Sequence, residues 1–227
     1  MSAVHPLRPA LRAGLERLAL PLTEAQCDTL LAYLDWIAKW NRVYNLTAVR
    51  EPADMLTHHL LDSLAVIAPL RRHLSQQGLE RLSLLDVGAG AGLPGVVVAI
   101  ACPEVDVSCV DTVAKKALFI QQVAAALRLP NLHGLHARVE NLTQPFDVVT
   151  SRAFASLADF TQWSGGALAD QGVWMAMKGK VPEPEMAALP PGVEVFHVEP
   201  LVVPGLDAER CLVWMRRTLS GTARETT

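Results

Sequence analysis

A glycine-rich loop between two apolar segments constrains the fold of this chain more than any other feature. The stretch LLDVGAGAGLPGVVVAI, residues 84–100, contains Gly88, Gly90, Gly92 and Gly95. A loop of this kind, leaving a buried strand and entering a helix, lies where open α/β sheets bind their ligands. Glycine lets the backbone approach such a ligand closely. We therefore expect an α/β fold with a ligand site at this loop, the alternative being glycines that only form a tight turn.

Short apolar segments alternate with helical segments from residue 82 onward. Strands are expected at 81–87, 105–111, 132–137, 146–153, 172–179, 193–201 and 210–217, and helices at 93–102, 114–129, 157–169 and 182–189. This alternation indicates crossover connections and a mostly parallel sheet covered on both faces. No clear helix separates the last two strands, so we expect them to form an antiparallel pair at one side of a seven-stranded sheet.

The first eighty residues have a helical pattern instead. Thr23 and Gln26 have capping-box spacing at the start of one helix, and its apolar residues then recur on one face. A second helix is predicted to start after Pro52 and to end in the basic turn at 71–73. We therefore predict a helical extension at 1–80, an α/β domain at 81–219 and a flexible polar tail at 220–227.

Composition excludes several classes of protein. The formal net charge is −3, so any nucleic-acid binding must come from a local basic surface. No apolar run approaches the roughly 20 residues of a membrane span, and no uninterrupted signal-peptide core is found at the N-terminus. The four cysteines form no C-x-x-C pair, which argues against a zinc site or a disulfide framework. We expect a cytoplasmic monomer with no metal ion and no membrane partner.

The register of the glycine loop discriminates between two cofactors. The literal G-x-G-x-x-G at 90–95 is typical of dinucleotide loops, in which the first glycine directly follows the strand. Here Gly88 follows the strand, and counting from it places Leu93 where the third glycine should lie. Pro94 also removes an amide donor from a helix start that a pyrophosphate would use. The register favours S-adenosylmethionine over NAD.

Two carboxylates support the same choice. Asp86, near the end of the first strand, can accept a hydrogen bond from the ammonium of S-adenosylmethionine but would repel a pyrophosphate. Asp111 ends the second strand about 20 residues after the loop, as expected for a residue that binds ribose hydroxyls under either cofactor. We therefore predict a S-adenosylmethionine site that includes Asp86, Gly88, Gly90, Gly92 and Asp111.

The acceptor of the methyl group is expected at the end of the strand at 146–153. That segment lacks the Asn/Asp-Pro-Pro-aromatic tetrad of adenine amino-group methyltransferases, and Cys102 lies away from it as a core residue. Arg152 suits a target that already carries a free lone pair, such as guanine N7, and Phe154 can stack on a base. The alternative is that Arg152 caps the sheet or pairs with a carboxylate such as Glu140.

Basic residues at other strand ends predict a local cationic patch. Arg138, Lys178, Lys180 and Arg210 all lie at such positions, and we expect Arg152 and Lys178 to lie near each other. Lys115 and Lys116 are interpreted as an ordinary solvated helix face. His58, His59 and Asp62 have helical spacing, which we interpret as surface or interdomain hydrogen bonding and not as a metal site.

Segments along most of the chain resemble one known family. They are WNRVYNLTAV, HHLLDSL, LLDVGAGAGLPGVVVAI, VDTVAKKALFIQQV, ARVENL, FDVVTSRAFASL and MKG. Together, from about Tyr33 to Arg217, they resemble the guanine-N7 methyltransferases of small-subunit ribosomal RNA, also called glucose-inhibited division protein B. The resemblance implies a Rossmann-like, class I S-adenosylmethionine-dependent methyltransferase fold with seven strands, the last antiparallel, and an N-terminal helical extension.

The resemblance also implies a reaction and its residues. It implies methyl transfer from S-adenosylmethionine to N7 of one guanosine in the decoding-region loop of 16S rRNA, in the small subunit or its precursor. Proximity and orientation would suffice without a general base. The implied residues are cofactor contacts at Gly88, Leu93, Val139, Glu140 and Arg152, Asp111 near the ribose, catalytic orientation by Arg152 and Lys178, and RNA contacts at Lys178 and Arg210. Arg138 is expected to contact RNA as part of the cationic patch.

Ala89 departs from the family, which often has Thr or Ser there, so one hydrogen bond would be missing while the backbone of the loop is unaffected. Three other functions stay open at this point. The excess of acidic over basic residues favours a small-molecule methyltransferase. An RNA assembly factor could retain the cofactor pocket without catalysis. An NAD oxidoreductase is the weakest alternative.

Overall fold

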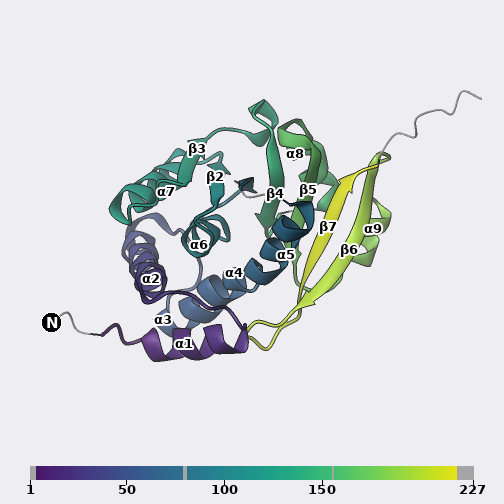
Figure 1. Cartoon of the computed structure of the whole chain (residues 1–227). Helices are drawn as coiled ribbons and strands as arrows, with labels where there is room; N and C mark the ends of the chain where they lie inside the picture. The colour runs from purple at the N-terminus through teal and green to yellow at the C-terminus, as the bar shows by residue number, and fades with distance from the viewer. Residues whose placement is uncertain (1–3, 79–80, 155, 219–227) are drawn as a thin grey trace, which may run out of the picture.

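A single sheet of seven strands forms the centre of the computed structural model, which describes residues 4–78, 81–154 and 156–218 (Figure 1). The predicted tail at 220–227 and residue 80, the predicted domain boundary, lie outside these ranges. The strand order is β3-β2-β1-β4-β5-β7-β6. The strands are β1 (Leu82–Val87), β2 (Val105–Asp111), β3 (Leu132–His136), β4 (Phe146–Arg152), β5 (Leu168–Lys178), β6 (Val193–Leu201) and β7 (Arg210–Arg217).

Strand pairing confirms the predicted topology. β1 pairs in parallel with β2 on one side and with β4 on the other, and β4 pairs in parallel with β5. β7 lies between β5 and β6 and is antiparallel to both, so the last strand runs opposite to its neighbours. The strand order therefore reverses next to β1, and the loop after β1 opens into the crevice where such sheets bind ligands.

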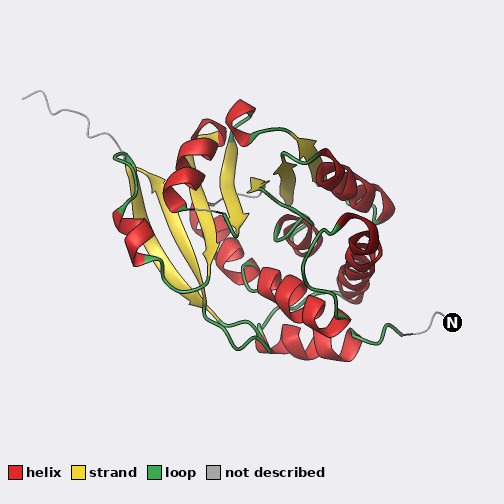
Figure 2. Cartoon of the chain, turned by 180° about the vertical axis from the view of Figure 1, so that it is seen from behind, coloured by secondary structure: helices red, strands yellow, loops and turns green. Residues whose placement is uncertain are grey.

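Helices cover both faces of the sheet (Figure 2). They are α1 (Arg8–Arg17), α2 (Glu24–Tyr44), α3 (Pro52–Met55), the π-helix η1 (Leu56–Leu61), α4 (Asp62–Leu64), α5 (Ile67–Gln77), α6 (Gly95–Ala101), α7 (Ala114–Ala126), α8 (Leu157–Ser164) and α9 (Glu183–Ala187), with 3-10 turns η2 (Val139–Asn141) and η3 (Gly165–Ala167). The predicted capping box is confirmed, because Thr23 and Gln26 exchange side chain–backbone hydrogen bonds of 3.2 and 3.0 Å. In the described ranges, no helix is long and apolar enough to cross a membrane.

Two predicted helices differ most from the structure. The helix after Pro52 is not continuous: a π-helical turn occupies Leu56–Leu61, a break follows α4, and α5 continues past the basic turn to Gln77. The helix predicted at 157–169 ends at Ser164, and β5 begins at Leu168. The second difference follows from packing, because Leu168 is buried and pairs with Phe146. This pairing makes β5 start before the apolar segment at 172–179 from which the strand was predicted.

The N-terminal helices share a hydrophobic core with the sheet. One cluster of buried side chains joins residues of α1, α2 and α5 to α6 and to one face of the strands, while a second cluster fills the opposite face beneath α8. The helices before β1 are therefore packed on the α/β unit, and their side chains reach the loop after β1. The division at residue 80 stays a prediction.

Candidate active site

The loop after β1 has the backbone that its glycines predict. Gly88, Gly90 and Gly92 have φ angles of 68°, 59° and 89°, in the left-handed region that glycine adopts without steric strain. The Gly88 amide donates to the Val110 carbonyl at 2.9 Å, which ties the loop to β2. A Cβ atom at Gly88 would approach only Phe154, at 4.0 Å, so the backbone leaves open space above the end of β1.

Asp86 lies beneath this loop. Its side chain is fully buried, its Oδ2 accepts from the Gly95 amide at 2.9 Å, and in the described ranges its Oδ1 has no hydrogen-bond partner. Burial raises the pKa of Asp86 to about 7, although the hydrogen bond from Gly95 opposes this shift. A Cβ at Gly95 would lie 2.9 Å from Asp86 Oδ2, so the third glycine of the literal dinucleotide motif is required by packing.

Tyr33 of α2 holds the loop from below. It is fully buried, and its hydroxyl donates to the carbonyl oxygens of Ala91 at 2.6 Å and Gly92 at 3.2 Å. Burial raises the pKa of Tyr33 well above its usual value, so the hydroxyl keeps its proton and remains a donor. Sequence reasoning did not single out Tyr33, because a tyrosine on the apolar face of a helix gives no sign of its partner.

A pocket of about 510 Å³ opens where β1, β2 and β3 end. Its volume is in the range of small-molecule sites. The lining residues include Gly88, Asp111, Val113, Lys116, Arg138, Val139, Glu140, Phe154 and Trp163. Asp111 is held there by two backbone amides, with Gly90 donating to its Oδ2 at 3.1 Å and Val113 to its Oδ1 at 2.9 Å. Carboxylate, backbone and aromatic surface around one cavity fit a nucleoside such as that of S-adenosylmethionine.

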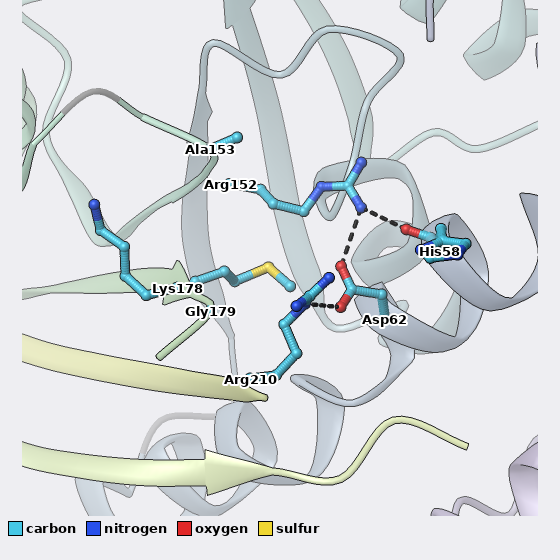
Figure 3. Close-up of a pocket in the computed structure, with 8 residues that line it drawn as sticks. His58, Asp62, Arg152, Ala153, Lys178, Gly179 and Arg210 are labelled. Atoms are coloured by element: carbon cyan, nitrogen blue, oxygen red, sulfur yellow. Dashed lines mark hydrogen bonds and ion pairs between the residues drawn. The ribbon is translucent and has the colours of Figure 1, made fainter. Parts of the chain in front are cut away.

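A second pocket, of about 400 Å³, opens where β4 and β5 end and β7 begins (Figure 3). It is lined by His58, Asp62, Arg152, Ala153, Met177, Lys178, Gly179 and Arg210. The structure thus brings Arg152, Lys178 and Arg210 to one pocket, and it confirms that the first two lie near each other. Arg138 lines the other pocket and does not join them.

Asp62 organises the two arginines of this pocket (Figure 3). Its carboxylate accepts from Arg152 Nη1 at 3.1 Å and from Arg210 Nε at 2.8 Å, and its side chain is only 3% exposed. Arg152 Nη1 also donates to the His58 carbonyl at 2.8 Å. The alternative that Arg152 pairs with a carboxylate is confirmed, but the partner is Asp62 and not Glu140, which lines the other pocket. Of the two interpretations of Asp62, a surface position is wrong because the side chain is buried, and hydrogen bonding to distant parts of the chain is confirmed.

Lys178 is paired with a different carboxylate. Its ammonium lies 2.8 Å from Glu185 Oε2 on α9, and in Figure 3 it points away from Asp62. Glu185 Oε2 also accepts from the Leu157 amide at 2.8 Å, so this pair ties α9 to the start of α8. Lys180, the next lysine along the chain, is almost fully exposed. Lys178 therefore has a structural partner in addition to any role toward a ligand.

The segment 152–154 separates the two pockets. Arg152 and Ala153 line the smaller pocket and Phe154 lines the larger one, where its ring lies 5.5 Å from that of Trp163. The two pockets therefore adjoin each other at this segment. That arrangement suits transfer between a nucleoside-bearing donor and an acceptor held by guanidinium groups.

The predicted site residues divide by location. Gly88, Asp111, Val139 and Glu140 line the larger pocket and Arg152 the smaller one. Asp86 is buried beneath the loop, Gly92 and Leu93 are buried within it, and Gly90 is partly buried. Tyr33, Asp62 and Trp163 were not predicted as site residues; the spacing of Asp62 from the histidines was the only available signal. In the part of the chain that the structure describes, no group of His, Cys, Asp and Glu could hold a metal ion.

Comparison with known proteins decides the family. The sequence pattern of the family described as rRNA small subunit methyltransferase G matches residues 26–213. This chain belongs to that family. The methyltransferase G relatives include a protein of Polaromonas sp. strain JS666, 72% identical over 207 residues that cover 91% of this chain and 92% of the relative. Another, from Acidovorax sp. strain JS42, is 66% identical over 212 residues that cover 91% of this chain and 94% of the relative.

Solved structures confirm the fold that the methyltransferase G resemblance implied. TrmN from Thermus thermophilus has a TM-score of 0.52 and 17% identity, covering 72% of this chain and 53% of its own. A SAM-dependent methyltransferase from Aquifex aeolicus has a TM-score of 0.50 and 16% identity, covering 73% of this chain and 98% of its own. The chain therefore has the class I S-adenosylmethionine-dependent methyltransferase fold, with a helical N-terminal part packed on the sheet.

Proposed function

We propose that this protein transfers the methyl group of S-adenosylmethionine to N7 of one guanosine in 16S ribosomal RNA. Membership in the methyltransferase G family supports methylation of small-subunit rRNA. The observation that carries the choice of guanine is the pair formed by Arg152 and Arg210, which Asp62 fixes beside the nucleoside pocket. Guanidinium donors recognise the O6 edge of guanine and the phosphates beside it.

The larger pocket would hold the cofactor. Asp111 would accept from the ribose hydroxyls, since its position is fixed by the amides of Gly90 and Val113. Val139 and Glu140 would line the adenine side, and Gly88 leaves the space above β1 that the methionine part needs. The unpartnered Oδ1 of Asp86 supports a role toward the cofactor's ammonium, directly or through a water molecule. When bound, the cofactor supplies a methyl group already activated by its sulfonium charge.

The residues of the smaller pocket would orient the acceptor. Guanine N7 carries a free lone pair, so no proton has to be removed before attack and no general base is needed. Arg152 and Arg210 would hold the base edge or its phosphate, and Phe154, which lines the larger pocket next to Ala153 of the smaller one, would stack on the base. Rate enhancement would then come mainly from placing N7 next to the methyl group. Arg152 is the residue proposed to contact both cofactor and acceptor.

Charge at this pocket is locally positive in a chain of net charge −3. Three cations, Arg152, Lys178 and Arg210, face two carboxylates, Asp62 and Glu185, so one positive charge is left over. This excess supports phosphate binding at the place where methyl transfer would occur. We also propose that the protein acts in the cytoplasm and is a monomer. Size-exclusion chromatography with light scattering would test the oligomeric state.

Methylation of ribosomal RNA from a deletion strain tests the proposal. Small subunits and deproteinised 16S rRNA from cells that lack this gene would be incubated with the purified chain and radiolabelled S-adenosylmethionine, and N7-methylguanosine would be mapped. We expect one guanosine to be labelled, and the same mark to be absent from the deletion strain. An N7 mark that persists in the deletion strain, or label on a small molecule only, would contradict the proposal.

A further inference from the structure

A stripe of aromatic side chains runs along α2 on the side that packs against α7. Trp36, Trp40 and Tyr44 recur every fourth residue and therefore lie on one side of the helix. The Trp40 ring lies 5.0 Å from that of Tyr44 and 5.2 Å from that of Phe119 on α7. Tyr44 is 39% exposed, so the stripe ends in an aromatic ring that solvent can reach.

A lysine lies over the ring at each end of this stripe. Lys39 Nζ is 5.5 Å from the centre of the Trp36 ring, and Lys115 Nζ, on α7, is 5.8 Å from the centre of the Tyr44 ring. Both distances are in the range of cation–π contacts. We call Trp36, Lys39, Trp40, Tyr44 and Lys115 the α2–α7 face. Figure 1 shows α2 and α7 together on the flank of the molecule away from β6 and β7.

The segments that form this face carry only positive charge. Residues 36–50 and 112–131 contain six lysines and arginines and no Asp or Glu, in a chain whose acidic residues outnumber its basic ones. Across the described ranges, Lys39 and Lys115 form no ion pair, whereas Arg8, Arg12 and Arg72 on other helices each do. The positive charge of the α2–α7 face is therefore available to an external anion.

The face adjoins the proposed cofactor site. Val113 and Lys116, on either side of Lys115 at the start of α7, line the larger pocket, and Lys116 lies 3.5 Å from Asp111. A polyanion that crosses the α2–α7 face therefore reaches the edge of the pocket. Exposed Leu118 and Val43 add apolar surface near the aromatic stripe.

We propose that the α2–α7 face binds an unpaired nucleotide and the adjoining phosphates of the ribosomal RNA substrate, outside the pocket that holds the target guanosine. Tyr44 provides an exposed ring on which a base stacks, and Lys115 beside it and Lys39 at the other end of the stripe neutralise adjoining phosphates. RNA fits this combination because it alternates flat aromatic bases with negative charges. This inference rests on the proposed function, since it takes 16S rRNA as the substrate.

Binding of 16S rRNA to matched variants of the full chain tests this proposal. The variants are Tyr44→Leu, which keeps apolar bulk without the ring, and the double change Lys39→Gln with Lys115→Gln. Arg17→Gln, at an exposed arginine on α1 that forms no ion pair in the described ranges, is the charge-matched control for one lysine. Each protein would be measured by filter binding across a salt series, with S-adenosylhomocysteine affinity measured by calorimetry.

We expect Tyr44→Leu to raise the Kd for rRNA about tenfold and the double lysine variant to lower the salt slope by about two. Affinity for S-adenosylhomocysteine and turnover at saturating rRNA should stay at the wild-type values. The proposal is overturned if both variants bind rRNA with the Kd and salt slope of Arg17→Gln. Co-sedimentation with phosphatidylglycerol vesicles is measured in parallel. The proposal is also overturned if the variants lose vesicle binding and keep wild-type rRNA binding, since the face would then contact a membrane surface.

The same assay separates this proposal from the proposed function. If the wild-type protein methylates 16S rRNA and the variants of the α2–α7 face bind rRNA normally, only the proposal for this face is refuted. Wild-type protein that methylates no ribosomal RNA would remove both proposals together.

Discussion

The hydroxyl of Tyr33 lies 2.6 Å from the carbonyl oxygen of Ala91, so a helix of the N-terminal part is bonded directly to the glycine loop. Ala91 and Gly92 belong to the turn that carries the backbone from β1 into α6. The loop is thus supported from below by α2, while Asp111 fixes it from the side of β2 through the Gly90 amide. The N-terminal helices are therefore part of the architecture of the proposed cofactor site.

Tyr33→Phe removes this bond without changing the packing of the ring. We expect the free energy of unfolding to fall by about 1–3 kcal/mol, because two buried carbonyl oxygens lose their donor. We also expect weaker binding of S-adenosylhomocysteine by calorimetry, since the loop loses its support. Tyr44→Phe, at an exposed ring, is the control and should match the wild type in urea unfolding. Unchanged cofactor affinity in Tyr33→Phe would contradict the proposed support.

Gly90→Val tests the glycine loop. The φ angle of 59° at Gly90 disfavours a β-branched residue, although a Cβ there would meet nothing closer than the Gly88 carbonyl at 3.9 Å. Because the loop would be strained, we expect the Kd of the variant for S-adenosylhomocysteine to rise at least about tenfold, which corresponds to about 1.4 kcal/mol. Gly165→Val, at a helical φ with open space, should bind normally. Equal affinities in both variants would show that the loop does not shape the site.

Asp86 makes stability depend on pH in an unusual direction. Burial raises the pKa of Asp86 in the folded state to about 7 from an ordinary value near 3.8. Between these two pH values, the Asp86 carboxyl group is ionised in the unfolded chain and protonated in the folded chain. Its contribution to the free energy of unfolding is therefore full at low pH and decreases by about 2 kcal/mol between about pH 5 and about pH 7.

The difference between wild type and Asp86→Asn in urea unfolding isolates this contribution. His59 acts in the opposite direction, because burial lowers its pKa to about 4, but it is present in both proteins and cancels. We expect the stability of the wild type relative to Asp86→Asn to decline as pH rises to 7. A difference that stays constant with pH would mean that Asp86 ionises normally in the folded state.

Arg152→Ala tests the proposed orientation of the acceptor. The side chain is 24% exposed at the end of β4, so the sheet should remain folded by circular dichroism. We expect methyl transfer to 16S rRNA to fall about 100-fold, the size of effect that loss of positioning produces. Arg72→Ala, which breaks an ion pair with Glu199 away from the pocket, should keep full activity. Normal turnover in Arg152→Ala would remove this residue from the site.

Asp62→Asn tests how the two arginines are held. The amide keeps the shape of the side chain but loses the charge that faces Arg152 and Arg210. We expect stability to fall by about 1–3 kcal/mol, since two partly buried guanidinium groups lose a charged acceptor, together with a lower kcat at saturating rRNA. Glu209→Gln is the control, because its contact with Lys180 spans 3.9 Å at the surface. Wild-type kcat with normal stability would contradict this role.

Much of the fold could be predicted because short-range patterns encode it. The alternation of apolar strands with amphipathic helices predicted the parallel sheet, and the missing helix between the last two strands predicted their antiparallel pairing. One wrong bound lies where tertiary packing overrides the local pattern, because Leu168 joins β5 by pairing with Phe146. The other was missed although its signal is local: α5 continues past the basic turn to Gln77 and is capped by Gly78, whose φ is 64°.

The glycine loop and its cofactor were determined by the sequence alone, because the register of Gly88 against the end of β1 is a local property of consecutive residues. The partners of Arg152 were decided only by the tertiary structure. Asp62 of α4 lies 90 residues before Arg152, and Arg210 at the start of β7 lies 58 residues after it; both arginines donate to the Asp62 carboxylate. Packing brings distant charges together, and no local sequence pattern encodes such a contact.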